Sequence, residues 1–113
     1  MAYLQKKNNA YGFVEDNPLT AIATTLNLGT DEGARFPSSG SFLLTIWDAV
    51  TYPDPSLDAG MEIVKCTART SDALTITRAQ ESTTASAHSY HTKVAMLITA
   101  GMLTELETAI DLR

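Results

Sequence analysis

The sequence predicts a mainly β protein: a small antiparallel barrel or sandwich with a short C-terminal helix and an extended N-terminal arm. Three observations support this fold class. Short apolar segments, alternating or continuous, recur along the chain, turn-forming residues separate them, and apolar residues take a helical spacing near the C-terminus. A chain of 113 residues suggests a single domain, in which we distinguish the arm (1–20), the β region (21–98) and the helix (99–113).

The arm is expected to have little secondary structure of its own, because Asn8-Asn9 and Asp16-Asn17-Pro18 are turn-forming clusters. Terminal arms are poorly ordered unless something holds them. The arm also carries three aromatic residues, Tyr3, Tyr11 and Phe13. Two interpretations stay open: these rings dock onto a neighbouring molecule, or they cover this domain's own core.

Five strands are expected in the β region, because five segments rich in apolar and β-branched residues are bounded by turn-forming residues. They lie at residues 21–28, 41–47, 61–68, 73–78 and 92–98. The first strand should bury the side chains of one parity, namely Ile22, Thr24, Leu26 and Leu28. The second is apolar on both faces, which predicts a central strand.

The third and fourth strands should form an antiparallel hairpin across residues 69–72, with Leu74 and Ile76 pointing inward. Residues 48–60 contain two prolines and three aspartates and form a loop long enough to contact a partner. Cys66, in the third strand, is the single cysteine of the chain. It excludes an internal disulfide and suggests a small structural side chain.

The C-terminal helix should run from residue 100 to about residue 112, with Thr99 as its N-cap. Apolar residues spaced three and four apart form a stripe on it: Leu103, Leu106 and Ile110, with Met102 beside them. Two interpretations stay open for this stripe. It packs on the sheet of its own subunit, or it forms a seam with the same helix of neighbouring copies around an axis.

The composition argues against several classes of protein. The net charge is −5 and the basic residues are scattered, so we expect no nucleic-acid partner. No apolar run approaches the roughly 20 residues of a membrane span, and the first residues lack the pattern of a signal peptide. The protein is therefore expected to be made in a cytoplasm and to have no membrane partner.

One segment is more informative than the rest of the chain. It reads Leu74-Thr-Ile-Thr-Arg-Ala-Gln-Glu-Ser-Thr-Thr-Ala-Ser-Ala-His88. This segment resembles the "LTVTRGQEGTTAAAH" pattern that recurs in virion proteins of tailed bacteriophages, especially in domains that attach or decorate fibres. Shorter pieces at Phe36-Pro37, Leu44-Thr-Ile46 and Glu62-Ile-Val64 follow the same family pattern in order, and the resemblance spans residues 26–106.

The resemblance implies a non-enzymatic virion structural protein: a tail fibre subunit, a tail adaptor or a baseplate-associated subunit, made in the host cytoplasm and located in the virion. It implies a homo-oligomer, expected to be a homotrimer, that attaches to other virion proteins. A capsid decoration (cement) protein is the alternative. Residues expected to contact partners are Tyr3, Tyr11, Phe13, Trp47 and Tyr52. A second alternative, a host-glycan-binding module, would use Trp47, Tyr52 or Tyr90 for stacking.

The segment departs from the family pattern at Ala79 and Ser82, where relatives often have glycine. If those glycines have positive φ, the loop of this chain must differ slightly. Within the segment, Arg78 and Glu81 either form an exposed ion pair, or Arg78 clamps backbone carbonyls or a carboxylate. In the second case, Gln80, Thr83 and Thr84 would satisfy backbone groups.

His88 and His91 form a His-x-x-His pair without a third ligand of suitable spacing. We therefore expect no metal and interpret His88 as a hydrogen-bonding residue at the surface or an interface. The sequence contains no nucleophile-elbow motif, no Gly-rich phosphate loop and no evident pair of catalytic carboxylates. The expectation is a protein without enzymatic activity and without a cofactor.

Overall fold

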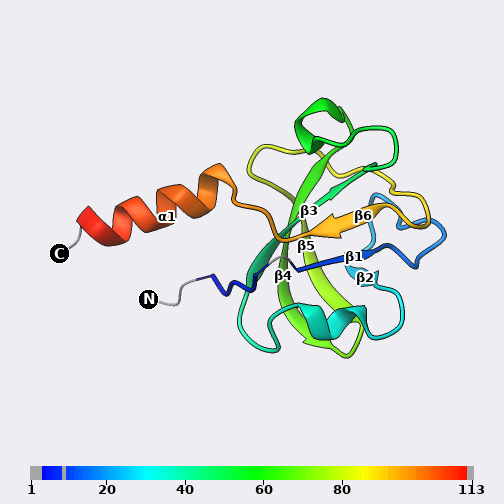
Figure 1. The fold of residues 1–113 in the computed structure, drawn as a ribbon, viewed down its shortest axis with the longest axis horizontal. Coiled ribbons are helices and arrows are strands. Elements are labelled where there is room, and N and C mark those ends of the chain that lie inside the picture. The colour runs from blue at the N-terminus through cyan, green and yellow to red at the C-terminus, as the bar shows by residue number, and fades with distance from the viewer. Residues whose placement is uncertain (1–3, 9, 112–113) are drawn as a thin grey trace.

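The computed structural model describes residues 4–8 and 10–111 (Figure 1). Within this part of the chain, one curled antiparallel sheet of six strands is followed by one α-helix, which confirms the predicted mainly β fold class. The strands are β1 (Tyr11–Phe13), β2 (Thr25–Asn27), β3 (Phe42–Trp47), β4 (Glu62–Thr70), β5 (Ala73–Gln80) and β6 (Lys93–Ala95). Two short 3-10 helices, η1 (Glu32–Arg35) and η2 (Pro55–Leu57), lie in the loops, and α1 spans Ala100–Asp111.

The strand order in the sheet is β1-β6-β3-β4-β5-β2. β3 is central as predicted, and all six of its residues are buried because both of its faces are covered. The two edges of the sheet approach each other: Val14 and Leu28 form an antiparallel bridge, and the amide of Glu15 donates to the carbonyl of Asn27 at 2.8 Å. The sheet thus curls toward a closed barrel, which leaves fewer unpaired edge groups.

β4 and β5 form the expected antiparallel hairpin, and both strands extend two residues further than predicted. Ser71 and Asp72 make the turn, with Ser71 at a φ of 56°. The carboxylate of Asp72 accepts the amides of Asp31 and Gly33 at 3.1 and 2.8 Å, so η1 is held against the turn. Gly33 has no room for a side chain, since a Cβ there would lie 2.0 Å from the carbonyl oxygen of Ser71.

The core lies inside the curl of the sheet and is mostly aliphatic. Leu74 and Ile76 of β5 point inward as predicted. Cys66 is fully buried, and burial raises the pKa of its thiol, as suits a small structural side chain. The largest apolar side chains that are fully buried are Val14, Leu19, Leu26, Phe36, Phe42, Leu44, Ile46, Val64, Leu74 and Val94.

The N-terminal arm differs from the prediction. Tyr11–Phe13 form β1, which pairs with β6 at the sheet edge, and the neighbouring Ala10, Val14 and Leu19 are core residues. The carbonyl and amide of Leu19 also bond those of His88, at 2.8 and 2.9 Å. Residues 10–20 therefore belong to the β domain. β1 has only three residues, too few for a visible alternating pattern, and its pairing partner lies far along the chain.

The first predicted strand is too long. β2 covers only Thr25–Asn27, and Ile22 is 89 % exposed rather than buried. Residues 20–23 form a turn instead, closed by a 3.2 Å bond from the amide of Ala23 to the carbonyl of Thr20. Leu26 and Leu28 are buried as expected. The fifth predicted strand is also shorter, since β6 covers only Lys93–Ala95.

Helix α1 begins where predicted, because the hydroxyl of Thr99 accepts the amide of Met102 at 3.2 Å. The helix does not pack on the sheet of its own subunit: Figure 1 shows it extending away from the β domain. That interpretation of the apolar stripe is therefore wrong. No helix in the described part of the chain is long and apolar enough to cross a membrane.

Candidate functional site

The segment from Leu74 to His88 covers most of β5 and the loop that follows it. β5 places Arg78 beside the start of β4, and the short pairing of His88 with Leu19 brings the imidazole to the same point. Both side chains meet the carboxylate of Glu62, the first residue of β4. Three elements distant in sequence therefore converge on one buried group.

Glu62 is the centre of this cluster and is fully buried. Its Oε1 accepts hydrogen bonds from Nη2 of Arg78 at 2.8 Å and from Nε2 of His88 at 2.9 Å. Its Oε2 accepts hydrogen bonds from Nε of Arg78 and from the backbone amide of Ala79, both at 2.9 Å. The amide of Ser86 approaches Oε1 at 3.3 Å. Arg78 thus binds the carboxylate in the bidentate geometry that guanidinium groups favour.

Arg78 also holds the backbone of two other segments. Its Nη1 donates to the carbonyls of Thr20 and Ala23, at 2.5 and 3.0 Å, and its Nη2 donates to that of Ser86 at 2.6 Å. Every N–H group of the guanidinium has a partner, so the clamp interpretation holds for Arg78. The 20–23 turn replaces the predicted strand because its carbonyls face this guanidinium.

The charge of the cluster follows from these contacts. Burial by itself would raise the pKa of Glu62, but the hydrogen bonds from Arg78 and His88, and from the amides of Ala79 and Ser86, lower it to about 2. Glu62 is therefore a carboxylate at neutral pH, paired with a guanidinium. Among the described residues, no buried side-chain nitrogen or oxygen lacks a hydrogen-bond partner.

Sequence reasoning missed the importance of Glu62, although a signal was present. Glu62 has the same strand parity as Val64 and Cys66, which are fully buried. A carboxylate on the buried face of a strand requires a cation or several hydrogen-bond donors. The presence of an arginine in the neighbouring strand, at Arg78, could have suggested the pair.

Glu81 does not form the ion pair with Arg78 that was one of the two interpretations. Within the described part of the chain it forms no ion pair with Arg78; instead, its carboxylate accepts the hydroxyl of Thr99 at 2.6 Å and the amide of Gly101 at 2.8 Å. A negative charge at the N-terminus of a helix is favourable. A Cβ at Gly101 would lie 2.6 Å from Oε2 of Glu81, so the contact is close. Glu81 thus joins the loop to the start of α1.

The remaining polar residues of the segment bond the backbone in part. The side-chain Nε2 of Gln80 donates a hydrogen bond to the carbonyl of Arg78 at 3.1 Å. The hydroxyl of Thr83 donates to the carbonyl of Gln80 at 2.7 Å and accepts the amide of Ile63 at 3.0 Å. The side chain of Thr84 is exposed. Gln80 and Thr83 therefore fit the expected role of satisfying backbone groups.

The loop keeps a backbone that suits glycine even though glycine is absent. Ala79, Glu81 and Ser82 have φ values of 56°, 52° and 67°, in the left-handed region. Ala79 and Ser82, the two positions that depart from the family pattern, thus both have positive φ in this chain. The bonds of Arg78 and Glu81 on either side hold the chain in this conformation, and the side chains carry the strain.

Replacing either Ala79 or Ser82 by glycine is expected to raise the free energy of unfolding by about 0.5–1 kcal/mol. Relief of left-handed strain contributes about 1–2 kcal/mol, and the greater freedom of glycine in the unfolded chain offsets part of it. Urea denaturation would measure the change. Ala87→Gly is the matched control in the same loop, since Ala87 is exposed and has no positive φ, and it should lower stability. A loss of stability in all three variants would contradict the strain.

The two histidines lie in different environments. His88 is 5 % exposed, so the expectation of a surface histidine is wrong. His91 is exposed and stacks on Tyr90 with ring centroids 3.7 Å apart. Within the described ranges, no group of three or more His, Cys, Asp or Glu residues could hold a metal ion.

The aromatic residues expected to contact partners differ in how far they are exposed. Trp47 is 5 % exposed, and its indole N–H donates to the carbonyl of Tyr52 at 3.0 Å, so its ring is no platform for a sugar. Tyr52 and Phe13 are half-buried. Tyr11 is 41 % exposed and has the cations of Arg35 and Lys93 near its ring. Tyr3 lies outside the described residues.

The predicted oligomer helix has its apolar stripe at the surface. Leu103, Leu106 and Ile110 are 51 %, 56 % and 47 % exposed, and Met102 is half-buried. The loop at residues 48–60 also exposes two large apolar side chains, Val50 and Leu57. Exposed apolar side chains that lie close together are typical of a surface that contacts another molecule.

No protein-family model matches the sequence, and no curated protein sequence matches it. The geometry described above and the resemblance of residues 74–88 are therefore the basis on which a function is proposed.

Proposed function

We propose that the protein is a non-enzymatic structural subunit of a tailed-phage virion, part of a tail fibre, tail adaptor or baseplate, that assembles as a homotrimer and attaches to other virion proteins. The observation that carries the proposal is α1. It extends from the β domain with its apolar stripe exposed, and its first turn is bonded to Glu81 of the phage-like segment.

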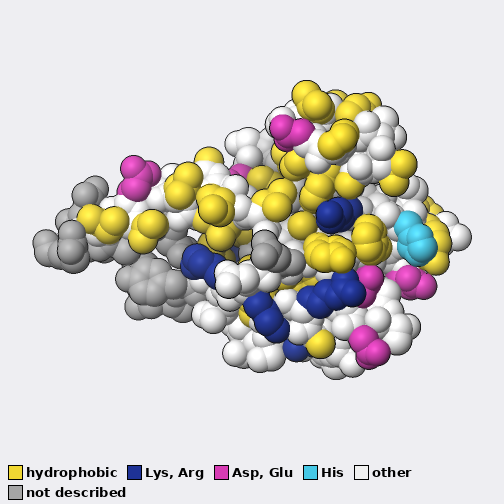
Figure 2. All heavy atoms as spheres, in the orientation of Figure 1, with side chains coloured by type: hydrophobic (Ala, Val, Ile, Leu, Met, Phe, Trp, Pro, Cys, Tyr) yellow, Lys and Arg dark blue, Asp and Glu magenta, His cyan; other side chains and the backbone are white. Residues whose placement is uncertain are grey.

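The exposed stripe supports assembly on physical grounds. An isolated helix of 12 residues is marginal in water, so α1 needs a surface to cover it. Figure 2 shows hydrophobic side chains along the helix on the viewed face. Leu103 and Leu106 would each contribute about 1.5–3 kcal/mol if fully buried in a contact between copies.

The buried cluster supports a structural role for the rest of the chain. Glu62 and Arg78 hold the end of β5, the turn at 20–23 and the loop after β5 in one arrangement. The same loop bonds the start of α1 through Glu81. The helix is therefore presented on a rigid base, which favours binding of several copies by limiting the entropy lost on assembly.

The copy number in purified particles tests the proposal. Quantitative mass spectrometry against the major capsid protein is expected to find a few copies of this chain per hundred capsid subunits. A ratio approaching one copy per capsid subunit would instead indicate the decoration protein, which would use the same exposed helix at capsomer junctions. Absence from particles would reject a virion role.

Leu106→Asp is expected to convert the trimer into monomers, because it places a charge in the contact between copies. Loss of the buried leucine alone should raise the dissociation constant about 10- to 100-fold. Sedimentation equilibrium measures the effect. Thr108→Asp is the matched control, since Thr108 is exposed and lies on the opposite side of the helix from Leu106. Equal dissociation by both variants would contradict a contact between copies at the stripe.

A further inference from the structure

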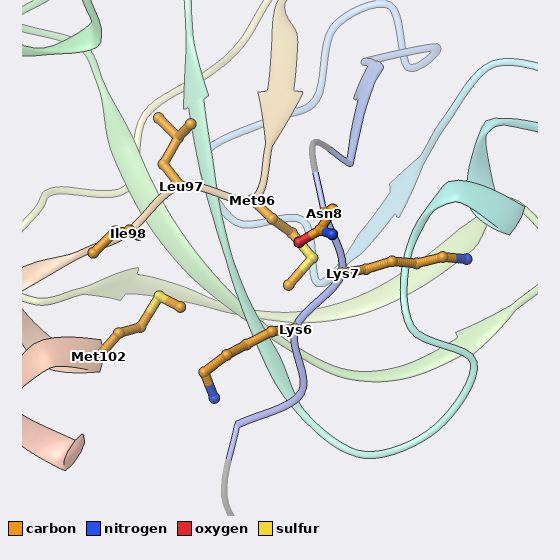
Figure 3. Close-up of a pocket in the computed structure, with 7 residues that line it drawn as sticks. All are labelled: Lys6, Lys7, Asn8, Met96, Leu97, Ile98 and Met102. Carbon is orange, nitrogen blue, oxygen red and sulfur yellow. The ribbon is translucent and has the colours of Figure 1, made fainter.

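A cleft lies between the N-terminal segment, the segment that follows β6 and the first turn of α1 (Figure 3). Its volume is about 580 Å³. Its walls are mainly apolar on one side, with Ile98 78 % exposed, and carry lysines on the other. The lining residues are Lys6, Lys7, Asn8, Met96, Leu97, Ile98 and Met102.

We infer that this cleft receives helix α1 of a second copy of the chain. The inference rests on the proposed function, since it names the surface on which the exposed stripe packs when the subunits assemble. Leu103 and Leu106 of one copy would cover Ile98 and Met102 of the next. Both sides of this contact are exposed or half-exposed apolar side chains, and their contact would remove both from water.

Charge complementarity identifies α1 as the occupant. α1 contains acidic residues and no Lys or Arg. Its exposed Glu107 follows Leu103 by four residues, so it lies beside the stripe on the helix surface. Figure 3 shows Lys6 extending toward the side of the cleft where Met102 lies. Its ammonium donates one hydrogen bond to the carbonyl of Leu4, and its remaining N–H groups can meet such a carboxylate. In a chain of net charge −5, a cation at the contact also reduces repulsion between copies.

The helix that enters the cleft belongs to another copy because the subunit's own α1 is directed away from it. Hydrogen bonds from Thr99 and Gly101 to Glu81 hold the first turn, and of the helix side chains that the structure describes only Met102 lines the cleft. Leu106 lies four residues further along an axis that leaves the β domain. Each helix would therefore leave its own subunit and enter the next, a head-to-tail contact that closes into a ring when the rotation allows.

Charge reversal at two lysines tests the inference. Lys6→Glu is expected to raise the dissociation constant about tenfold by sedimentation equilibrium at low ionic strength. Lys65→Glu is the control for the change in net charge, because Lys65 lies in β4 and does not line the cleft. It should change the constant less than about twofold. Adding Glu107→Lys to Lys6→Glu should restore assembly.

Cysteine cross-linking separates the cleft from a symmetric seam. A mixture of Ile98→Cys and Leu106→Cys copies is expected to form disulfide-linked dimers that neither variant forms alone. Cross-linking of Leu106→Cys by itself, with unchanged assembly of Lys6→Glu, would place the helices against one another and overturn the inference while leaving the oligomer intact. A wild-type chain that stays monomeric at all concentrations would overturn both the inference and the proposed assembly.

Discussion

Glu62→Ala is expected to lower the free energy of unfolding by about 3–5 kcal/mol, a large part of the stability of a small domain. The variant leaves the guanidinium of Arg78 buried without its carboxylate, and it removes the acceptor for His88 and for the amide of Ala79. Urea denaturation followed by circular dichroism would measure the loss. Glu15→Ala is the control: Glu15 is exposed, so the change should stay within about 0.5 kcal/mol.

A double-mutant cycle with Arg78→Met shows whether the loss belongs to the pair. The variant carrying both Glu62→Ala and Arg78→Met should be more stable than the sum of the two single effects predicts, by about 2–3 kcal/mol, because it leaves no buried charge unpaired. Some loss will remain, since the carbonyls of Thr20, Ala23 and Ser86 also lose their donor. Additive effects of the two substitutions would contradict a coupled pair.

Acid is expected to destabilise the protein by about 3 kcal/mol through Glu62 alone, between about pH 5 and pH 2. The pKa of Glu62 is about 2 in the folded protein, below its ordinary value of 4.5. In this range the unfolded chain binds more protons than the folded one, so stability rises with pH. The contribution of Glu62 is complete above about pH 5 and is lost as the pH falls toward 2.

The difference between the wild type and Glu62→Gln isolates this contribution. The pKa values of Asp48 and Asp54 are also lowered, by hydrogen bonds from Thr51 and from Ser56 respectively, so other carboxylates add to the total acid sensitivity. Unfolding free energies at several pH values should give curves that converge in acid, because the amide side chain of the variant does not titrate. Parallel curves for the two proteins would show that Glu62 has an unperturbed pKa.

The segment from Leu74 to His88 makes two separate contacts that its sequence does not distinguish. Arg78 and Glu81 are three residues apart and carry opposite charges, which suggested a pair with each other. Arg78 instead turns into the barrel toward Glu62, and Glu81 turns outward to the start of α1. The left-handed conformations of Ala79 and Glu81 make this divergence possible, since they break the alternation of the strand.

Local patterns were sufficient for much of the fold. The central position of β3, the β4–β5 hairpin and the inward Leu74 and Ile76 follow from alternation and turn chemistry in neighbouring residues. The same holds for the Thr99 cap of α1. These features depend on contacts or periodicities within a few residues, which a single sequence records directly.

The features that required the tertiary structure depend on contacts between distant residues. Glu62 and Arg78 are 16 positions apart, and the carbonyl of Thr20 lies 58 positions from its guanidinium donor. β1 became a strand only through β6, and α1 leaves the sheet because Glu81 holds its first turn. Sequence patterns determined most of the segments that form strands and the helix. The burial of the Glu62 carboxylate and the direction of α1 were decided by the tertiary structure, because charge and hydrogen bonding there outweigh local propensity.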